Sequence, residues 1–245
     1  MARHVLLNNV DHQDLKIITR YSAEFGHDIH AAVTFPTEYG DVQREYPIFF
    51  RRSGDRGDYQ SVALLGLEPG ENLFLDDGLW NASYVPGIIA KGPFLIGFQE
   101  QEVDGEVRKE PVIHIDLDDP RVNGNEGEAV FLEHGGNSPY LQHIAAVLRG
   151  IQEGMAVAGP MFAALESHEL IEPVNVEIDV HGDVKYELKG YYTISEERLR
   201  LLPGDALERL NKAGFLHGAF MVLSSLHNVG KLVEMKRRRV LQQRP

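Results

Sequence analysis

The chain has 245 residues, of which 43% are hydrophobic, and its 24 basic and 37 acidic residues give a formal net charge of −13. It contains no cysteine, which excludes disulfides, thiolate nucleophiles and cysteine-based metal sites. The acidic balance argues against nucleic acid as a partner, and no stretch approaches the roughly 18 apolar residues of a membrane span. The N-terminus has no signal-peptide pattern, so we expect a soluble protein in the cytoplasm.

Short strands dominate the first half of the chain. Five apolar-rich stretches predict strands at 46–51, 61–67, 72–75, 94–98 and 111–117. A turn at Pro69-Gly70 separates the second strand from the third, and a short helical turn is expected before the fourth. Asp104-Gly105 predicts a hairpin over 103–107, because Asp-Gly suits a tight two-residue turn.

A long helix is predicted to begin at Ser138-Pro139, because a capping hydroxyl followed by proline is typical of a helix start. Apolar residues then recur at steps of three and four, the spacing of one helix face: Leu141, Ile144, Leu148, Ile151 and Met155. Gly159-Pro160 is expected to break or kink this helix, which resumes over 161–170.

A second hairpin follows, with strands at 174–180 and 184–194 around a turn at 181–183. Its first strand alternates apolar and polar residues, which predicts one buried and one solvated face. Two helices are expected to close the chain, the first capped by Asp205 and the second carrying residues 216–226. The basic run 236–239 predicts a solvated C-terminal helix end, with docking on an acidic partner as the alternative.

These elements predict an α+β fold, a largely antiparallel sheet with helices packed on it, in a single domain. The domain spans 1–245, with a sheet-rich part at 1–135 and a helix, a hairpin and closing helices over 136–240. No Ser/Pro-rich or low-complexity linker interrupts the chain, so no second domain is expected.

A set of short motifs is spread over most of the chain: 62–67, 70–75, Trp80, 84–86, 93–94, 115–116, 120–122, 126–131, 140–141, 188–192, Glu197, Leu199 and 214–216. In these motifs the chain resembles the SapC-like family of bacterial proteins. The resemblance implies a link to bacterial surface layers. It also implies relatives that are neighbours, in gene order, of flavin-dependent halogenases, cupin-like oxygenases and outer-membrane receptors. It implies no established activity and carries no catalytic residue onto this chain.

One group of residues near the Pro69-Gly70 turn is a candidate ligand-binding site: Glu71, Asn72, Asp76, Trp80 and Tyr84. Aromatic side chains beside a few polar groups are typical of small-molecule and peptide sites. The structural alternative is that the acid and the amide satisfy backbone donors of the turn, with the tryptophan packed in the core.

His114 and Asp116 are a candidate metal pair. Residues two apart on a strand point to the same face, and a His-x-Asp step is found in the iron site of 2-oxoglutarate oxygenases. A third ligand would come from a later histidine: His134, His168, His181, His217 or His227. The alternative is an ordinary hydrogen-bonded histidine on a strand, because eleven histidines make such a match easy.

The sequence favours a soluble accessory or binding protein over an enzyme, and that reading needs no cofactor. We expect it to act with a peptide- or small-molecule-modifying enzyme, such as a halogenase or oxygenase, or with a surface-transport system. The alternative is a metal-dependent enzyme that uses Fe(II) with 2-oxoglutarate, and a third reading is a structural surface-layer component. Exposed edge strands are compatible with a homodimer, although nothing in the sequence specifies one.

Overall fold

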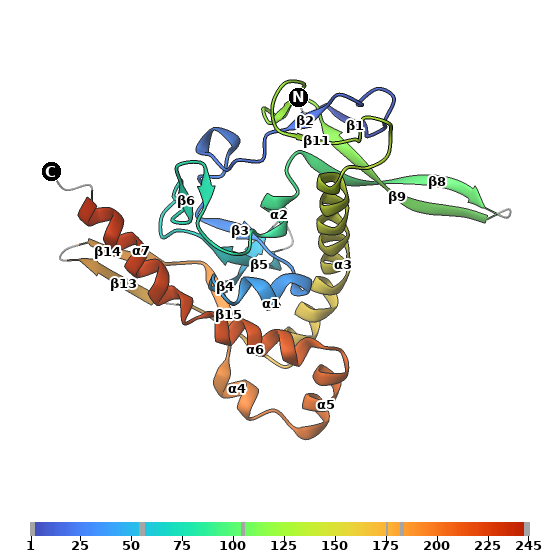
Figure 1. The fold of residues 1–245 in the computed structure, drawn as a ribbon. Helices are drawn as coiled ribbons and strands as arrows, with labels where there is room; N and C mark the ends of the chain where they lie inside the picture. Colours follow the sequence, from blue (N-terminus) through green and yellow to red (C-terminus); the bar gives the residue numbers. More distant parts are fainter. Residues whose placement is uncertain (1–2, 54–56, 104–105, 175, 182–183, 243–245) are drawn as a thin grey trace.

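A five-stranded antiparallel sheet forms the centre of the molecule (Figure 1). The computed structural model describes residues 3–53, 57–103, 106–174, 176–181 and 184–242. In sheet order the strands are β12 (Ile171–Pro173), β15 (Tyr191–Ile194), β4 (Ile48–Ser53), β5 (Asp58–Leu64) and β3 (Ala31–Val33). The first half of β4 and the second half of β5 are apolar on both faces, and both faces are buried.

A second sheet has the strand order β1 (His4–Leu6), β9 (Glu106–Asp116) and β8 (Phe94–Val103). The long β8–β9 hairpin projects from the body of the molecule (Figure 1). Its register pairs Val103 with Glu106, as expected for a hairpin turn between them. The predicted turn residues themselves, Asp104 and Gly105, lie outside the described part of the chain. A small third sheet joins β10 (Val122–Asn123), β2 (Lys16–Ile17) and β11 (Glu128–Ala129).

The long helix α3 (Pro139–Ser167) connects two hydrophobic cores. Its first half packs with the second sheet through Leu141, Ile144 and Leu148, and its second half packs with the five-stranded sheet through Met161, Phe162 and Leu165. It begins as predicted, with the Ser138 hydroxyl accepting the N–H of Leu141 at 3.1 Å.

Of the break or kink predicted at Gly159-Pro160, the break is wrong, because α3 is continuous through both residues; the kink stays a prediction. Proline inside a helix costs about 3 kcal/mol or more. Burying the three apolar side chains that follow it contributes about 1.5–3 kcal/mol each, which outweighs that cost. Pro160 itself is exposed, so its ring lies in solvent.

The C-terminal part contains more helices than the two predicted: α4 (Glu196–Arg200), α5 (Gly204–Lys212), α6 (Phe215–Ser225) and α7 (Asn228–Gln242). Helix α6 packs on β4 and β15, and α7 packs on the separate hairpin of β13 (Val176–His181) and β14 (Val184–Leu188). Asp205 does not cap α5 as expected. Pro203 occupies the cap position, and Asp205 lies 3.0 Å from Arg209.

The segment after β5 differs from the predicted pair of strands. Residues 72–75 do not pair as a strand with 61–67; β6 (Leu75–Asp76) pairs with β7 (Leu79–Trp80) instead. The only backbone bond that continues the expected pairing here, among those the structure gives, joins the Leu73 N–H to the Leu65 carbonyl at 2.9 Å. The reason is the intervening turn, whose Glu71 and Asn72 side chains bond to nearby backbone and hold it as a loop.

Four short helical turns complete the fold: η1 (Ala23–Phe25), η2 (Pro36–Glu38), α1 (Tyr39–Val42) and α2 (Gly87–Ala90). The turn α2 followed by β8 confirms the short helix and strand predicted for 85–98. Antiparallel pairing throughout the described strands, together with the packed helices, confirms the α+β fold class. Within the described residues, none of the helices combines the length and apolar character needed to cross a bilayer.

Candidate ligand-binding site

A cleft of about 470 Å³ runs along the N-terminal half of α3. Its other walls come from η2, α1 and the segment that leads into α2, and its lining is mainly aromatic and aliphatic with a few polar groups: Tyr21, Phe35, Thr37, Glu38, Asp41, Ser83, Tyr84, Val85, Gly87, Ala90, His143, Ala146, Val147, Gly150 and Ile151. Clefts of this size and character are typical of small-molecule sites.

Two contacts hold α3 and the start of η2 close together. The Thr37 hydroxyl donates to the Gly150 carbonyl at 2.9 Å. Gly154 lies directly against Phe35, where a Cβ atom would overlap the phenylalanine side chain. A glycine at this position therefore allows the helix and the turn to approach closely.

The Glu38 carboxylate organises one wall of the cleft. One oxygen accepts the Thr34 hydroxyl at 2.8 Å and the Phe35 N–H at 3.1 Å, and the other accepts the Tyr84 hydroxyl at 2.6 Å and the Gly87 N–H at 2.8 Å. Burial and the neighbouring carboxylate raise the pKa of Tyr84 above its usual value. Glu38 thus connects η2 to the start of α2, and Tyr84 stays protonated as its donor.

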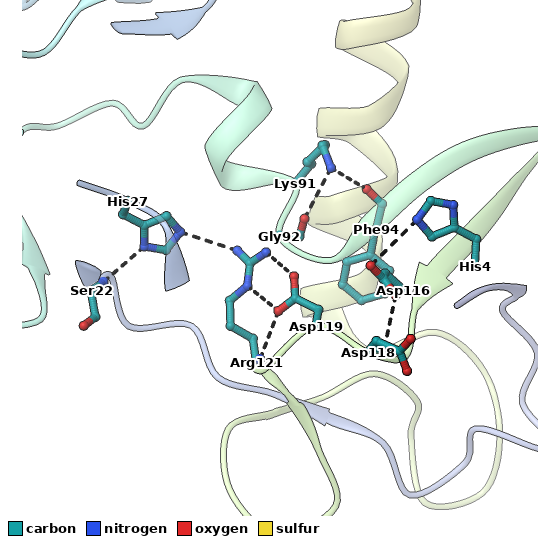
Figure 2. Close-up of polar contacts among 10 residues, drawn as sticks. All are labelled: His4, Ser22, His27, Lys91, Gly92, Phe94, Asp116, Asp118, Asp119 and Arg121. Atoms are coloured by element: carbon teal, nitrogen blue, oxygen red, sulfur yellow. Dashed lines mark hydrogen bonds and ion pairs between the residues drawn. The ribbon is translucent and has the colours of Figure 1, made fainter. Parts of the chain in front are cut away.

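A polar cluster lies beside the cleft, where residues from three distant segments meet (Figure 2). Arg121 donates from Nε and Nη2 to the two oxygens of Asp119, at 2.9 and 2.6 Å. Its remaining nitrogen, Nη1, faces the ring of His27 at 3.5 Å. Lys91 donates to the Phe94 carbonyl at 3.1 Å, so its ammonium group is anchored to the backbone nearby.

Burial and charge tune the protonation of this cluster. Burial, together with the Arg121 guanidinium, lowers the pKa of His27 to about 4. Burial and Arg121 also lower the pKa of Lys91. Burial opposes ionisation of Asp119, but its hydrogen bonds from Arg121 hold the pKa of that carboxyl below its ordinary value. At neutral pH the cluster therefore combines a neutral imidazole with an Arg–Asp ion pair.

The His27 pKa gives a pH-dependent stability with a definite sign. The pKa is about 4 in the folded protein and 6.5 in the unfolded chain, so between these values the unfolded state binds more protons. We expect the free energy of unfolding to fall by about 2 kcal/mol more in the native protein than in His27→Gln as pH is lowered from about 7 to about 4.5. Urea unfolding at a series of pH values measures this, and an NMR titration that placed His27 near its ordinary pKa would contradict it.

The residues predicted around the Pro69-Gly70 turn are not brought into one site. Glu71 and Asn72 line a hollow with Lys236 and Arg239, Trp80 lines another hollow with Lys231, and Tyr84 lines the cleft along α3. Asp76 is exposed on the β6–β7 hairpin.

Glu71 and Asn72 are both buried and bonded to the backbone. Glu71 accepts the Leu67 N–H at 3.1 Å and pairs with Lys236 at 2.7 Å. Asn72 accepts the Phe74 N–H at 3.0 Å and donates to the His27 carbonyl at 2.8 Å. These bonds are the ones expected from residues that stabilise a turn.

Trp80 and Tyr84 are linked through one buried side chain. The Trp80 indole donates to the Tyr46 hydroxyl at 2.7 Å, and that hydroxyl donates to the Tyr84 carbonyl. Trp80 is partly buried and packs against the main core. Trp80 and Tyr46 therefore support the backbone of the segment leading into α2. Of the two predicted aromatic residues, Trp80 and Tyr84, only Tyr84 lines the cleft.

His114 and Asp116 lie on β9, opposite Leu6 and His4 of β1. The His114 ring packs on Gly97 of β8, where a Cβ atom would overlap it. Asp116 accepts the Arg3 N–H at 3.0 Å and lies 3.7 Å from His4 (Figure 2). Within the described residues no group of three or more His, Asp or Glu side chains is arranged to hold a metal ion. Metal binding at this pair stays a prediction.

The cluster of His27, Arg121, Asp119 and Lys91 was not recognised from the sequence. Its members come from segments up to 94 residues apart, and no spacing signals their meeting. The one available signal was Arg121, which lies in the 120–122 motif of the family resemblance. The basic run 236–239 is solvated only in part: Arg237 and Arg238 are exposed as predicted. Lys236, by contrast, is buried against Glu71, and Arg239 donates to the Asn72 and Leu75 carbonyls at 3.2 and 3.1 Å.

Comparison with known proteins gives one match. No curated protein and no solved structure matches the chain significantly. The family model described as SapC matches residues 7–232, which includes both the cleft and the polar cluster. The matched range contains all the motifs from 62 to 216, and the chain belongs to the SapC family.

Proposed function

We propose that this protein is an accessory binding protein, which holds a small molecule or a peptide segment for a modifying enzyme or a surface-transport system. The observation that supports it is the cleft along α3, whose volume of about 470 Å³ suits such a ligand and whose walls are largely apolar. Apolar walls favour binding, and the few polar groups would orient the ligand.

The polar groups of the cleft favour binding over catalysis. Glu38 accepts four hydrogen bonds from the scaffold, which leaves it poorly placed to take a proton from a ligand. The Thr37 hydroxyl is bonded to a helix carbonyl. His143, by contrast, is exposed on α3 and lines both the cleft and the hollow beside Arg121, so it is available to contact a ligand.

The proposal includes a cytoplasmic location and a protein partner, such as a halogenase or an oxygenase. The gene neighbours implied by the family resemblance support this choice of partner. A net charge of −13 argues against nucleic acid as the partner. A homodimer is compatible with the proposal but is not required by it.

Affinity selection followed by mass spectrometry tests the proposal. The purified protein is incubated with a small-molecule and peptide extract of the cells that make it. Two variants are compared: Ala146→Trp, which fills the cleft, and Ala156→Trp, a matched control at an exposed position of the same helix outside the cleft. We expect the native protein and Ala156→Trp to enrich the same molecule, and Ala146→Trp to lose it.

Three outcomes would overturn the proposal. The first is that the native protein enriches no molecule, and the second is that Ala146→Trp enriches the same molecule equally well. The third is chemical conversion of the enriched molecule by the protein, tested with and without added Fe(II) and 2-oxoglutarate. Conversion that depends on both additions and is lost in His114→Ala would support the oxygenase reading instead.

A further inference from the structure

In the His27 ring, the hydrogen bond that one nitrogen accepts determines that the other nitrogen is a donor. Nδ1 lies 3.1 Å from the Ser22 N–H, a backbone donor, so Nδ1 accepts. A neutral imidazole has one acceptor and one donor nitrogen, and therefore Nε2 carries the proton. The residue is 5% exposed, and its ring packs between Tyr21 and Phe25, with ring centroids at 5.3 and 6.1 Å.

Arg121 brings a second hydrogen-bond donor, Nη1, close to His27 Nε2. Asp119 accepts from Nε and Nη2, which fixes the guanidinium plane and leaves Nη1 directed at His27 Nε2, 3.5 Å away (Figure 2). Both atoms carry hydrogens, so they do not hydrogen-bond each other. Among the described residues no acceptor is bonded to either group at this point. Two fixed donors, one of them charged, thus converge without an acceptor.

The space beside these donors is hollow. A cavity of about 90 Å³ is lined by both side chains, by Gly92 and by Tyr140 of α3. A Cβ atom on Gly92 would lie 3.7 Å from the Tyr140 hydroxyl and 3.9 Å from Arg121 Nη1, and Gly92 has φ +58°, so the position favours glycine and leaves this space open. The volume exceeds what a single water molecule needs.

We infer that this cavity is a subsite for an anionic oxygen group, a carboxylate or a phosphate, held by Arg121 Nη1 and His27 Nε2. The Arg121 guanidinium supplies the charge, and its pairing with Asp119 orients it before the ligand arrives. The Lys91 ammonium group, anchored to the Phe94 carbonyl, adds positive charge nearby. The Tyr140 hydroxyl provides a further polar group at the cavity wall.

The subsite adjoins the cleft along α3. The two hollows share three lining residues, Tyr21, Ala90 and His143. A ligand with an apolar body in the cleft would therefore extend its acidic end to Arg121 and His27. The placement of the ligand's apolar body in the cleft rests on the proposed function. The anion subsite does not, because the Arg121 and His27 donors define it.

NMR detection of the His27 ring tests the subsite with simple anions. Sodium acetate, sodium phosphate and, as the reference, sodium chloride are titrated into the native protein at constant ionic strength. We expect a saturable shift of the His27 Nε2–H signal with acetate or phosphate, while the signals of the other ten histidines change less. Preference for acetate identifies a carboxylate ligand, and preference for phosphate identifies a phosphorylated one.

Variants separate the subsite from the cleft. Arg121→Gln should weaken the binding of the preferred anion by about tenfold or more, whereas the exposed-site control Arg44→Gln should leave it unchanged. Ala146→Trp should still bind the anion. If this variant loses the ligand enriched from the extract but still binds the anion, the cleft and the subsite are separate sites. The inference is overturned if His27 shows no saturable response to either anion. Because this readout uses the native protein, the test holds even if Arg121→Gln fails to fold.

Discussion

Replacing Lys236 with methionine is expected to lower the free energy of unfolding by about 4 kcal/mol. The ammonium group is buried, with the whole residue 5% exposed, and lies 2.7 Å from a Glu71 oxygen and close to Glu68. Burial alone would lower its pKa, but its hydrogen bonds to Glu68 and Glu71 raise the pKa above the ordinary value. Methionine fills similar space but leaves the Glu71 carboxylate, 8% exposed, without its counter-charge.

The cost comes from the partner that remains, so a second substitution should recover much of it. In Lys236→Met with Glu71→Gln, the buried charge is gone, and the amide oxygen can still accept the Leu67 N–H. We expect this double variant to be about 2 kcal/mol more stable than Lys236→Met alone. Urea unfolding at neutral pH measures both.

Lys231→Met serves as the control on the same helix. Lys231 is 40% exposed and pairs with Glu45 at 3.2 Å, and pairs exposed in this way contribute about 1 kcal/mol or less. Equal losses for Lys231→Met and Lys236→Met would show that burial does not determine the cost. If the double variant were as unstable as Lys236→Met alone, the unpaired Glu71 would not be the source of the lost stability.

Local elements were predictable because their signals are local. The Ser138 hydroxyl caps the helix that Pro139 begins, and the alternating residues of β13 form a hairpin strand, as their spacing indicated. The predicted strand 184–194 is divided at Gly190, which has φ +77°. Residues before Gly190 pair with β13, and those after it enter the five-stranded sheet beside β4. A glycine permits this change of direction, but whether the strand divides there depends on which strands each part pairs with in the folded protein.

The candidate site depends on contacts between segments that no pattern connects. The prediction near the Pro69-Gly70 turn selected Glu71 and Asn72 for their chemistry, yet backbone groups and Lys236 occupy those side chains. Glu38 lies in no motif of the sequence analysis, and Arg121 lies in the 120–122 motif, to which no role was assigned. Their importance lies in partners 46 and 94 residues away, Tyr84 and His27, which only the folded chain brings together.

Replacing Glu38 with alanine is expected to lower the free energy of unfolding by about 4 kcal/mol and to loosen the cleft wall. The substitution removes the acceptor of four donors, including the buried N–H groups of Phe35 and Gly87 and the buried Thr34 hydroxyl. Hydrogen exchange should rise most in residues 83–90, because the Tyr84 hydroxyl and the Gly87 N–H attach this segment to η2.

Graded variants show that the carboxylate, and not merely its volume, holds this wall. Glu38→Gln keeps the shape but replaces one acceptor oxygen with a donor nitrogen, so we expect a loss of about 2 kcal/mol. Glu153→Gln, exposed on α3, is the matched control and should change stability by less than about 0.5 kcal/mol. If Glu38→Gln left both stability and exchange at 83–90 unchanged, the wall would depend on Tyr46 and its bond to the Tyr84 carbonyl instead. The expected order, alanine worse than glutamine and both worse than the control, links the shape of the cleft to one buried carboxylate.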